Sequence, residues 1–245
     1  MTSRRILRLT GSDCESFLQG LITNDIAGLD HGLVYTALLT PQGKYLADFF
    51  VARDGDAVLI DVHDSLGDML VKRLTMYKLR ADVTIEESGL NVQRGTGPAP
   101  ADAFPDPRHE ALGWRRYSDA PEGDDGTDWD ALRVAHMVPE TGIELTPDTF
   151  ILEAGFEGLR GVDFRKGCYV GQEVTARMKH KTELRKGLAR VRVEGTAPIG
   201  SEVLSNGKIA GTLFTQSGGH GIAYLRFDRA TGEMSAEAAK VWLEK

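Results

Sequence analysis

One cysteine lies in the stretch GVDFRKGCYVGQEVTARMKHK, Gly161 to Lys181, between a basic arm and a glycine. Lys166 stands two residues before Cys168, and positive charge near a thiol favours the thiolate, the form that reacts and binds metals. Gly167 and Gly171 would each cost a helix interior roughly 1 kcal/mol against alanine. Their spacing predicts a loop or turn whose backbone is closely approached by another group. The sequence therefore makes Cys168 a candidate working thiol.

The residues around this loop allow a second interpretation. Gln172 and Glu173 offer an amide and a carboxylate that can fix a polar ligand, or the start of a helix. The basic side chains are equally typical of a solvated surface; they are Arg165, Arg177, Lys179, His180 and Lys181. Under that interpretation Cys168 is a bystander.

A cysteine hydrolase is disfavoured because a nucleophilic cysteine needs a histidine base. No spacing singles out one of the six histidines, which are His31, His63, His109, His136, His180 and His220. No cysteine or histidine cluster has ligand spacing either, so no permanently bound metal is expected.

The composition is that of an ordinary globular protein of one or two domains. The chain has 245 residues, a net charge of −7 and a pI near 5.4, a poor footprint for nucleic-acid binding. Its two cysteines, Cys14 and Cys168, exclude a disulfide framework and fit a reducing compartment. The start of the chain is polar and no apolar run has membrane-spanning length. We expect a bacterial cytoplasm, with an organelle matrix as the alternative, and no membrane partner.

Hydrophobic periodicity predicts an α+β fold. Cys14 shares the apolar face of a helix over Ser12–Ile22, so we expect it to be core packing. A second amphipathic helix is predicted over Asp64–Arg80. The turn signals PQG, Pro41–Gly43, and DGD, Asp54–Asp56, separate the apolar runs Leu33–Thr40, Lys44–Asp54 and Asp56–His63 into an antiparallel meander. Two further strands are predicted over Arg4–Gly11 and Ala81–Ser88.

The local amino-acid composition changes from about residue 95 onward. Within residues 95–130, the stretches 95–113 and 119–128 are rich in Pro, Gly and Asp, which predicts surface connections there. A helix over Asp128–Val138 is stopped by Pro139. Short strands follow from about residue 185, with a tight hairpin at Asn206-Gly207. We expect two domains, residues 1–185 and a small β unit over 186–245.

The octapeptide KGCYVGQE, Lys166–Glu173, resembles the signature of the YgfZ family. Further blocks resemble that family in the same order, over roughly residues 5–190: FLQGLITNDI, LLTPQGKYLADFFV, LTMYKLRADVTI, DPRHEALGWR and LRVAHMVPE. The family is similar in turn to the glycine-cleavage T-protein, an aminomethyltransferase that uses tetrahydrofolate. The resemblance makes Gly167, Tyr169 and Gly171 motif residues around Cys168.

This resemblance implies a GcvT/YgfZ-like α+β fold of three lobes. Antiparallel sheets would surround a central folate-binding opening, and a small C-terminal β-barrel would follow. It also implies tetrahydrofolate or a folate derivative as cofactor, and a part in assembling or repairing iron–sulfur clusters in client enzymes, including tRNA-modifying ones. Cys168 would be the working thiol, and Lys166 and Arg165 would lower its pKa. One cysteine cannot hold a cluster alone, so it would act with a partner protein or as a redox thiol.

Asp48 falls where T-proteins carry the carboxylate that contacts the folate ring, so it is a candidate catalytic and cofactor-binding residue. The alternative is that Asp48 points outward by strand alternation. Asn24, with Asp25, would line the same opening or cap the next turn. Tyr77 and Arg80 would share a helical face, with Tyr77 stacking on the pterin and Arg80 pairing with the glutamate tail, although core packing explains Tyr77 equally well. The remaining candidate folate contacts are Gln172, Glu173 and Arg177.

Two departures from the T-protein pattern weaken an aminomethyl-transfer interpretation. The chain reads LRVAHM, without a carboxylate at Ala135, and YVGQE, with Gln172 where T-proteins tend to have arginine. Folate-dependent one-carbon (aminomethyl) transfer remains the alternative function, and enzyme status is left open. Direct RNA binding through the basic tract from Arg177 to Arg190 is not expected at this net charge.

Overall fold

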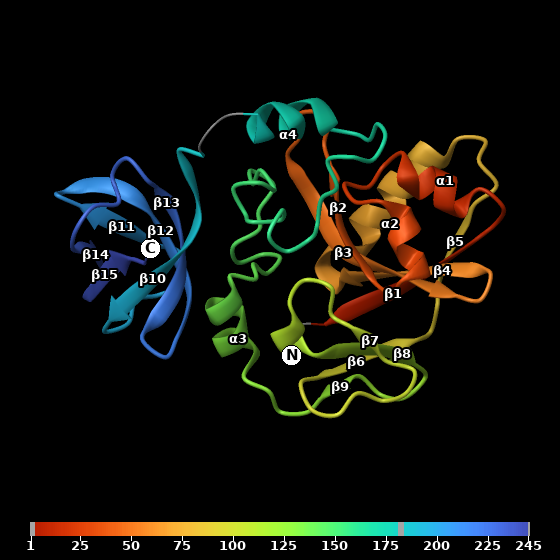
Figure 1. Ribbon diagram of the computed structural model, residues 1–245, viewed down its shortest axis with the longest axis horizontal. Helices are drawn as coiled ribbons and strands as arrows, with labels where there is room; N and C mark the ends of the chain where they lie inside the picture. Colours follow the sequence, from red (N-terminus) through yellow and green to blue (C-terminus); the bar gives the residue numbers. More distant parts are fainter. Residues whose placement is uncertain (1–2, 181–183, 245) are drawn as a thin grey trace. The chain divides into compact units, whose positions relative to one another are not determined.

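The structure is a computed structural model that describes residues 3–180 and 184–244 (Figure 1). The chain divides into two compact units. Unit 1 comprises Met1–Thr127 and Glu157–Glu173, and unit 2 comprises Asp128–Phe156 and Val174–Lys245. The predicted division at residue 185 differs from these units, because residues 128–156 group with the C-terminal strands.

Unit 1 is built on a five-stranded antiparallel sheet in the order β2-β3-β4-β1-β5. The strands are β1 (Arg4–Thr10), β2 (Val34–Leu39), β3 (Tyr45–Asp54), β4 (Ala57–His63) and β5 (Thr84–Glu87). The predicted meander is confirmed as β2-β3-β4. Gly43 and Gly55 take positive φ angles of 75° and 58° in its two turns, as the PQG and DGD signals predict.

Two helices cover one face of this sheet (Figure 1). They are α1 (Cys14–Gln19) and α2 (Asp64–Lys78), and a 3-10 helix, η1 (Ile26–Asp30), follows α1. Alternate strand residues such as Phe49 and Ile60 pack against Leu18, Leu70 and other apolar side chains of the helices. Cys14 belongs to this cluster with 4% of its surface exposed, which confirms core packing.

Both helices end earlier than predicted. The first stops at Gln19 and not at Ile22, and Gly20 is its C-cap. The second stops at Lys78, because Leu79 takes a φ of 44° that a right-handed helix cannot continue through. Arg80 therefore lies beyond the helix and does not share a helical face with Tyr77.

A second sheet passes through the next part of the chain, and two of its short strands lie within the stretches 95–113 and 119–128 that are predicted as surface connections. Its order is β7-β8-β6-β9, with β6 (Asn91–Gly95), β7 (Phe104–Pro105), β8 (Trp114–Ser118) and β9 (Gly123–Asp124), and the 3-10 helix η2 (Glu110–Leu112) precedes β8. Charged and hydroxyl side chains such as Arg115 and Tyr117 face buried carboxylates. Apolar alternation, the usual strand signal, is therefore absent from β8.

Unit 2 contains a closed six-stranded barrel in the order β10-β13-β12-β11-β14-β15. The strands are β10 (Lys186–Glu194), β11 (Ser201–Ser205), β12 (Lys208–Ser217), β13 (His220–Arg226), β14 (Met234–Ala236) and β15 (Ala239–Leu243). Asn206 and Gly207, at φ angles of 50° and 72°, form the predicted hairpin turn. The barrel confirms the expected C-terminal β-barrel.

Residues 128–156 are joined to the barrel by buried polar contacts. The guanidinium of Arg133, in α3 (Trp129–His136), pairs with the carboxylate of Glu144. Glu144 also accepts a 2.5 Å hydrogen bond from the hydroxyl of Thr215 on β12. Glu153 likewise accepts from the hydroxyl of Tyr224 on β13, at 2.6 Å. These contacts explain why the segment groups with the C-terminal strands.

The last helix, α4 (Gln172–Lys179), begins directly after the KGCYVG segment. Across residues 3–180 and 184–244, no helix is both long and apolar enough to cross a bilayer.

Candidate functional site

Cys168 lies in the unit 1 loop that leads into α4, and its side chain is exposed. Gly167, beside it, is also exposed, and a Cβ placed there would meet no atom within 4 Å. The two residues flanking this pair, Lys166 and Tyr169, are 6% and 8% exposed. The loop thus presents a thiol between two buried anchors.

Lys166 is the first anchor. Its ammonium nitrogen donates hydrogen bonds to the main-chain oxygens of Gln19, Ile22 and Asn24, at 2.7, 2.6 and 3.0 Å. Burial lowers the pKa of the Lys166 ammonium group to about 8, although Asp25 and Asp163 attract the charged form. The side chain that the sequence assigned to activating the thiol is therefore committed to the carbonyls at the end of α1.

Tyr169 and Gly171 hold the other side of the loop. The ring centroid of Tyr169 lies 5.2 Å from the Lys166 ammonium nitrogen, within cation–π range. Gly171 has a φ of 84°, and a Cβ there would come within 2.6 Å of the carbonyl oxygen of Thr40. The motif needs glycine at this position for its backbone angle and for its close approach to the β2–β3 turn.

A second set of hydrogen bonds joins the chain before Cys168 to the segment after α1. The Thr23 hydroxyl donates to the carbonyl oxygen of Gly161 at 2.7 Å. The Asp163 amide donates to the carbonyl oxygen of Thr23 at 3.1 Å. The Asn24 amide group donates to the carbonyl oxygen of Arg160 at 2.7 Å. The ITND sequence therefore supports the cysteine loop.

The side chains of Asn24 and Asp25, candidates to line the folate opening, are both used in hydrogen bonds to main-chain groups. The Asn24 side chain also donates to the carbonyl oxygen of Tyr35, at 2.8 Å, so its amide group is committed to main-chain oxygens. The Asp25 side chain accepts from the amide of Ala27 and is the N-cap of η1, as the capping alternative predicted.

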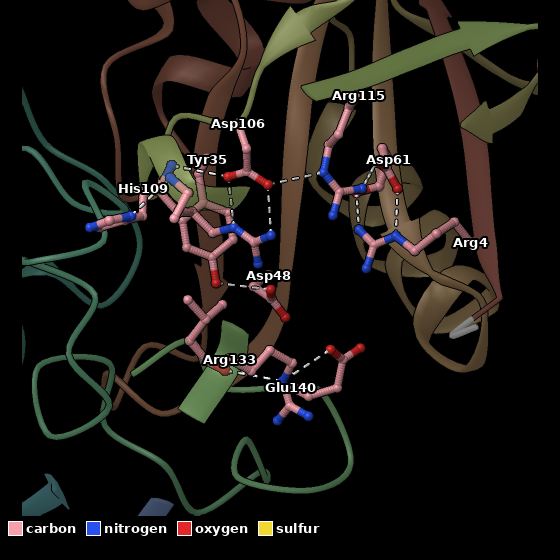
Figure 2. Close-up of polar contacts among 12 residues, drawn as sticks. Arg4, Tyr35, Asp48, Asp61, Asp106, His109, Arg115, Arg133 and Glu140 are labelled. Carbon is pink, nitrogen blue, oxygen red and sulfur yellow. Dashed lines mark hydrogen bonds and ion pairs between the residues drawn. The ribbon is translucent and has the colours of Figure 1, made fainter. Parts of the chain in front are cut away.

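Asp48 lies on β3 and is 6% exposed, so the alternative that it points out to solvent is wrong. Its two carboxylate oxygens accept hydrogen bonds from the hydroxyls of Tyr35, at 2.9 Å, and Tyr45, at 2.6 Å. Figure 2 shows the contact with Tyr35. The carboxylate is thus part of a buried polar cluster on the sheet face that α1 and α2 leave uncovered.

Asp61, on β4, is the centre of the same face and was missed in the sequence (Figure 2). Its carboxylate pairs with Arg4 at 2.6 Å and with Arg115 at 2.9 Å, and it accepts the Tyr117 hydroxyl at 3.0 Å. Burial alone would raise the pKa of Asp61, but Arg4 and Arg115 lower it below its usual value. The signal was available, because an aspartate inside the apolar run AVLIDVH is as unusual as Asp48.

Asp106 and Arg108 complete the cluster. Arg108 holds Asp106 through two contacts, at 3.0 and 2.8 Å, and Arg115 approaches Asp106 at 3.4 Å. The guanidinium carbons of Arg108 and Arg115 lie 4.8 and 4.0 Å from the ring centroid of Phe50. Attraction to Asp106 raises the pKa of Arg108 despite its burial. Three arginines face three aspartates here, so the buried charges balance.

The structure separates other residues that the sequence grouped with Asp48. Tyr77 packs against the apolar cluster beneath α1 and α2, whereas Asp48 alternates with Phe49 and faces the opposite side of the sheet. The Gln172 amide reaches the carbonyl oxygen of Gly167 at 3.5 Å. Arg80, Glu173 and Arg177 are exposed, and Lys181 lies outside the described residues. Their contacts with folate stay predictions.

Within residues 3–180 and 184–244, no three His, Cys, Asp or Glu side chains gather as a metal site. What the loop offers chemically is a single accessible thiol on a supported backbone. Such a thiol can supply one ligand to a metal or take part in thiol exchange.

Comparison with solved structures defines the fold. The chain resembles the crystal structure of glycine cleavage system aminomethyltransferase T from Bartonella henselae with a TM-score of 0.76 and 13% identity. The alignment covers 100% of this chain and 83% of that one. Residues 185–245 match the family described as CAF17, C-terminal beta-barrel domain. The predicted α+β fold of the T-protein type with a C-terminal barrel is confirmed.

Curated relatives share more sequence. The chain is 29% identical to the mouse protein named iron-sulfur cluster assembly factor IBA57, mitochondrial, over 98% of this chain and 80% of that protein. The human protein of that name is 28% identical with the same coverage. A Neurospora crassa homolog is 33% identical, and there the chain spans about half of the relative, 54%. The narrower assignment to the YgfZ family stays a prediction.

The comparison contradicts the expected bacterial cytoplasm. The relatives in mouse, human and Neurospora crassa are all named as mitochondrial proteins. The expectation had rested on the composition of the first residues, which is a weak guide to compartment.

Proposed function

We propose that this protein is an accessory factor for assembling or repairing iron–sulfur clusters in client enzymes, with Cys168 as its working thiol. The names of the mouse, human and Neurospora crassa relatives support the first part of the proposal. The second part is carried by one observation: Cys168 is exposed between buried anchors, while Cys14 is packed in the core.

The chemistry is ligand exchange at iron. A cluster normally needs four thiolates or equivalent ligands, so Cys168 supplies one and a partner protein supplies the rest. The Cys168 thiol releases its proton to solvent, and its sulfur donates an electron pair to a cluster iron. A thiolate of the delivering protein leaves that iron and takes up a proton. No electron enters or leaves the cluster in this step, so no oxidant or reductant is needed.

Tetrahydrofolate, or another folate derivative, is the ligand that we propose for unit 1. The side chains around Asp48 are of the types that such a ligand uses. A carboxylate can accept pterin N–H groups beside tyrosine hydroxyls, because each of its oxygens accepts more than one hydrogen bond. Tyr35 and Tyr45 add aromatic surface beside that carboxylate. When bound, folate would supply one-carbon chemistry; the chain's own residues would bind and orient it.

A complementation experiment tests both parts. Cells depleted of their own iron–sulfur assembly factor of this type receive wild type, Cys168→Ala, Cys14→Ala or Asp48→Asn. The activity of a 4Fe–4S dehydratase is measured, and tetrahydrofolate affinity is measured on the purified proteins. We expect Cys168→Ala to lose client activity while binding folate normally, and Cys14→Ala to keep both. We expect Asp48→Asn to bind folate at least about tenfold more weakly.

The experiment can overturn the thiol part and the folate part of the proposal separately. Full rescue by Cys168→Ala would make the thiol a bystander. Full rescue by Cys168→Ala together with failure of Asp48→Asn would favour folate-dependent group transfer, the alternative function. Unchanged folate affinity in Asp48→Asn would remove folate from the Asp48 cluster and leave the thiol proposal standing.

A further inference from the structure

The last carbonyl of α1, that of Gln19, accepts a hydrogen bond from a lysine that lies outside the helix. The last carbonyls of a helix lack intrahelical partners and carry partial negative charge. Basic side chains commonly supply the missing donors, but α1 has no basic residue in its last turn. Lys166, 147 residues away, donates to one helical carbonyl, that of Gln19. It also donates to the carbonyls of Ile22 and Asn24, which lie just beyond the helix.

We propose that Lys166 is a positioning residue for Cys168: its ammonium group clamps the loop to the end of α1 and so fixes where the thiol projects. This inference rests on the proposed function, since it assigns the residue that prepares the same thiol for its partner. It replaces the interpretation drawn from sequence, in which Lys166 activates the thiol by charge.

The geometry suits an ammonium group and no other side chain. An ammonium has three N–H donors, and three main-chain oxygens converge on it at 2.6 to 3.0 Å. The guanidinium of arginine is planar and directs its donors in a fixed fork, so it cannot match three oxygens around one point. A methionine matches the stem in length but leaves all three carbonyls without this donor.

The clamp works on a short span of chain. Only Gly167 and Cys168 separate the buried side chains of Lys166 and Tyr169. The hydrogen bonds from Thr23 and Asn24 to Gly161 and Arg160 fix the chain just before Lys166. Since Gly167 adds no side chain to restrain the backbone, the position of the thiol depends on the two anchors.

The test separates positioning from activation. Lys166→Met and Lys166→Arg are compared with wild type, and Lys72→Met, an exposed lysine on α2, is the matched control. The thiol pKa is taken from the pH dependence of Cys168 alkylation, followed on the Cys168 peptide by mass spectrometry. Amide hydrogen exchange is measured over residues 19–25 and 160–170, and 4Fe–4S client activity is measured in cells.

For both Lys166 variants we expect exchange in the two segments to rise about tenfold. Client activity should fall at least about fivefold with a thiol pKa within about 0.3 unit of wild type. Lys72→Met should match wild type throughout. The inference is overturned if Lys166→Met raises the thiol pKa by about one unit and Lys166→Arg restores it, or if Lys166→Met changes neither exchange nor client activity.

Asn24→Ala guards against a Lys166 variant that does not fold. It removes the hydrogen bond from Asn24 to the carbonyl oxygen of Arg160, which joins the same two segments. Amide exchange over residues 19–25 and 160–170 should therefore rise, by less than in the Lys166 variants. If Asn24→Ala leaves amide exchange in both segments unchanged, the hydrogen bonds between these segments do not position the loop. A Cys168→Ala arm keeps the two proposals apart: if that variant is fully active, the proposed function fails, whatever the Lys166 variants do to exchange.

Discussion

The carboxylate of Asp61, on β4, pairs with the guanidinium of Arg115, on β8, at 2.9 Å, and both side chains are nearly inaccessible to solvent. A charge from the five-stranded sheet is thereby matched by a charge from the four-stranded sheet. Arg4 on β1 shares the same carboxylate, through a 2.6 Å contact. Buried ion pairs thus join the two sheets of unit 1, so their association should be sensitive to the removal of a single charge.

The first prediction follows from that pairing. Asp61→Asn leaves two buried guanidinium groups facing a neutral amide, and removing one partner of a buried ion pair costs about 3–5 kcal/mol. We expect the free energy of unfolding in urea to fall by about that amount. Asp68→Asn is the control, because Asp68 pairs with Arg5 at the surface with 95% of its side chain exposed, and such pairs contribute about 1 kcal/mol or less. Equal losses in the two variants would contradict the prediction.

The second prediction concerns acid. Burial would raise the pKa values of Asp61 and Asp106, yet their arginine partners hold both below the usual value. Carboxylates with a lowered native pKa stabilise the fold above their unfolded pKa of about 4 and lose that contribution as pH falls through the native value. We expect the free energy of unfolding to drop steeply below about pH 4. Asp61→Asn should flatten that drop, and Asp68→Asn should not.

The third prediction concerns the two thiols. Burial, reinforced by nearby Asp82, raises the pKa of the Cys14 thiol, and the side chain lies inside the apolar cluster. Cys168 is exposed. We expect a neutral alkylating reagent to modify Cys168 in the native protein and Cys14 only after unfolding, as read from peptide masses. Modification of Cys14 at a comparable rate in native buffer would contradict this placement.

Much of the fold could be predicted because local signals agreed with it. The β2-β3-β4 meander follows from apolar runs separated by turn residues, and the Asn206-Gly207 hairpin from its turn chemistry. The four-stranded sheet could not be predicted in this way. Its strand β8 reads WRRYS, in which Arg115 is buried against Asp61 and Asp106, and Tyr117 donates to Asp61. Asp61 lies 54 residues from Arg115, so no local pattern reveals the pairing.

The sequence predicted the cysteine at the centre of the candidate site but not the hydrogen bonds that hold its loop. KGCYVGQE identified Cys168, and its glycines indicated a loop. The role of Lys166 could not be predicted, because its acceptors are main-chain oxygens of Gln19, Ile22 and Asn24, which no side-chain pattern reveals. Asp48 is predicted from the T-protein resemblance and Tyr77 from its aromatic ring, and the sheet separates the two residues.

The fourth prediction tests the close approach at Gly171. Gly171→Ala would place a Cβ 2.6 Å from the Thr40 carbonyl oxygen, at a φ of 84°. Gly142 has a similar φ of 81° with no atom within 4 Å, so Gly142→Ala isolates the backbone cost, about 1 kcal/mol. We expect Gly171→Ala to lose clearly more stability and to change the alkylation rate of Cys168. Equal losses would mean that the loop shifts without strain.

The fifth prediction concerns Lys166 at alkaline pH. Burial lowers the pKa of its ammonium group to about 8, while the unfolded chain keeps the ordinary value of about 10.4. Between these values the unfolded state binds one more proton, so this group makes the free energy of unfolding rise with pH by up to about 1.4 kcal/mol per unit. Urea unfolding from pH 7 to 10 should show wild type gaining on Lys166→Met, with Lys72→Met parallel to wild type.

Locally the same linkage should act in the same direction. A segmental opening that frees Lys166 returns the pKa of its ammonium group from about 8 to the ordinary value of about 10.4, so the open form binds the extra proton and is disfavoured as pH rises. The free energy of opening over residues 160–166, obtained from amide exchange corrected for its intrinsic pH dependence, should therefore rise in wild type in step with global stability. Lys166→Met has no ammonium group to titrate, so its opening free energy should not follow this ionisation. An opening free energy that falls in wild type while global stability rises would contradict the prediction.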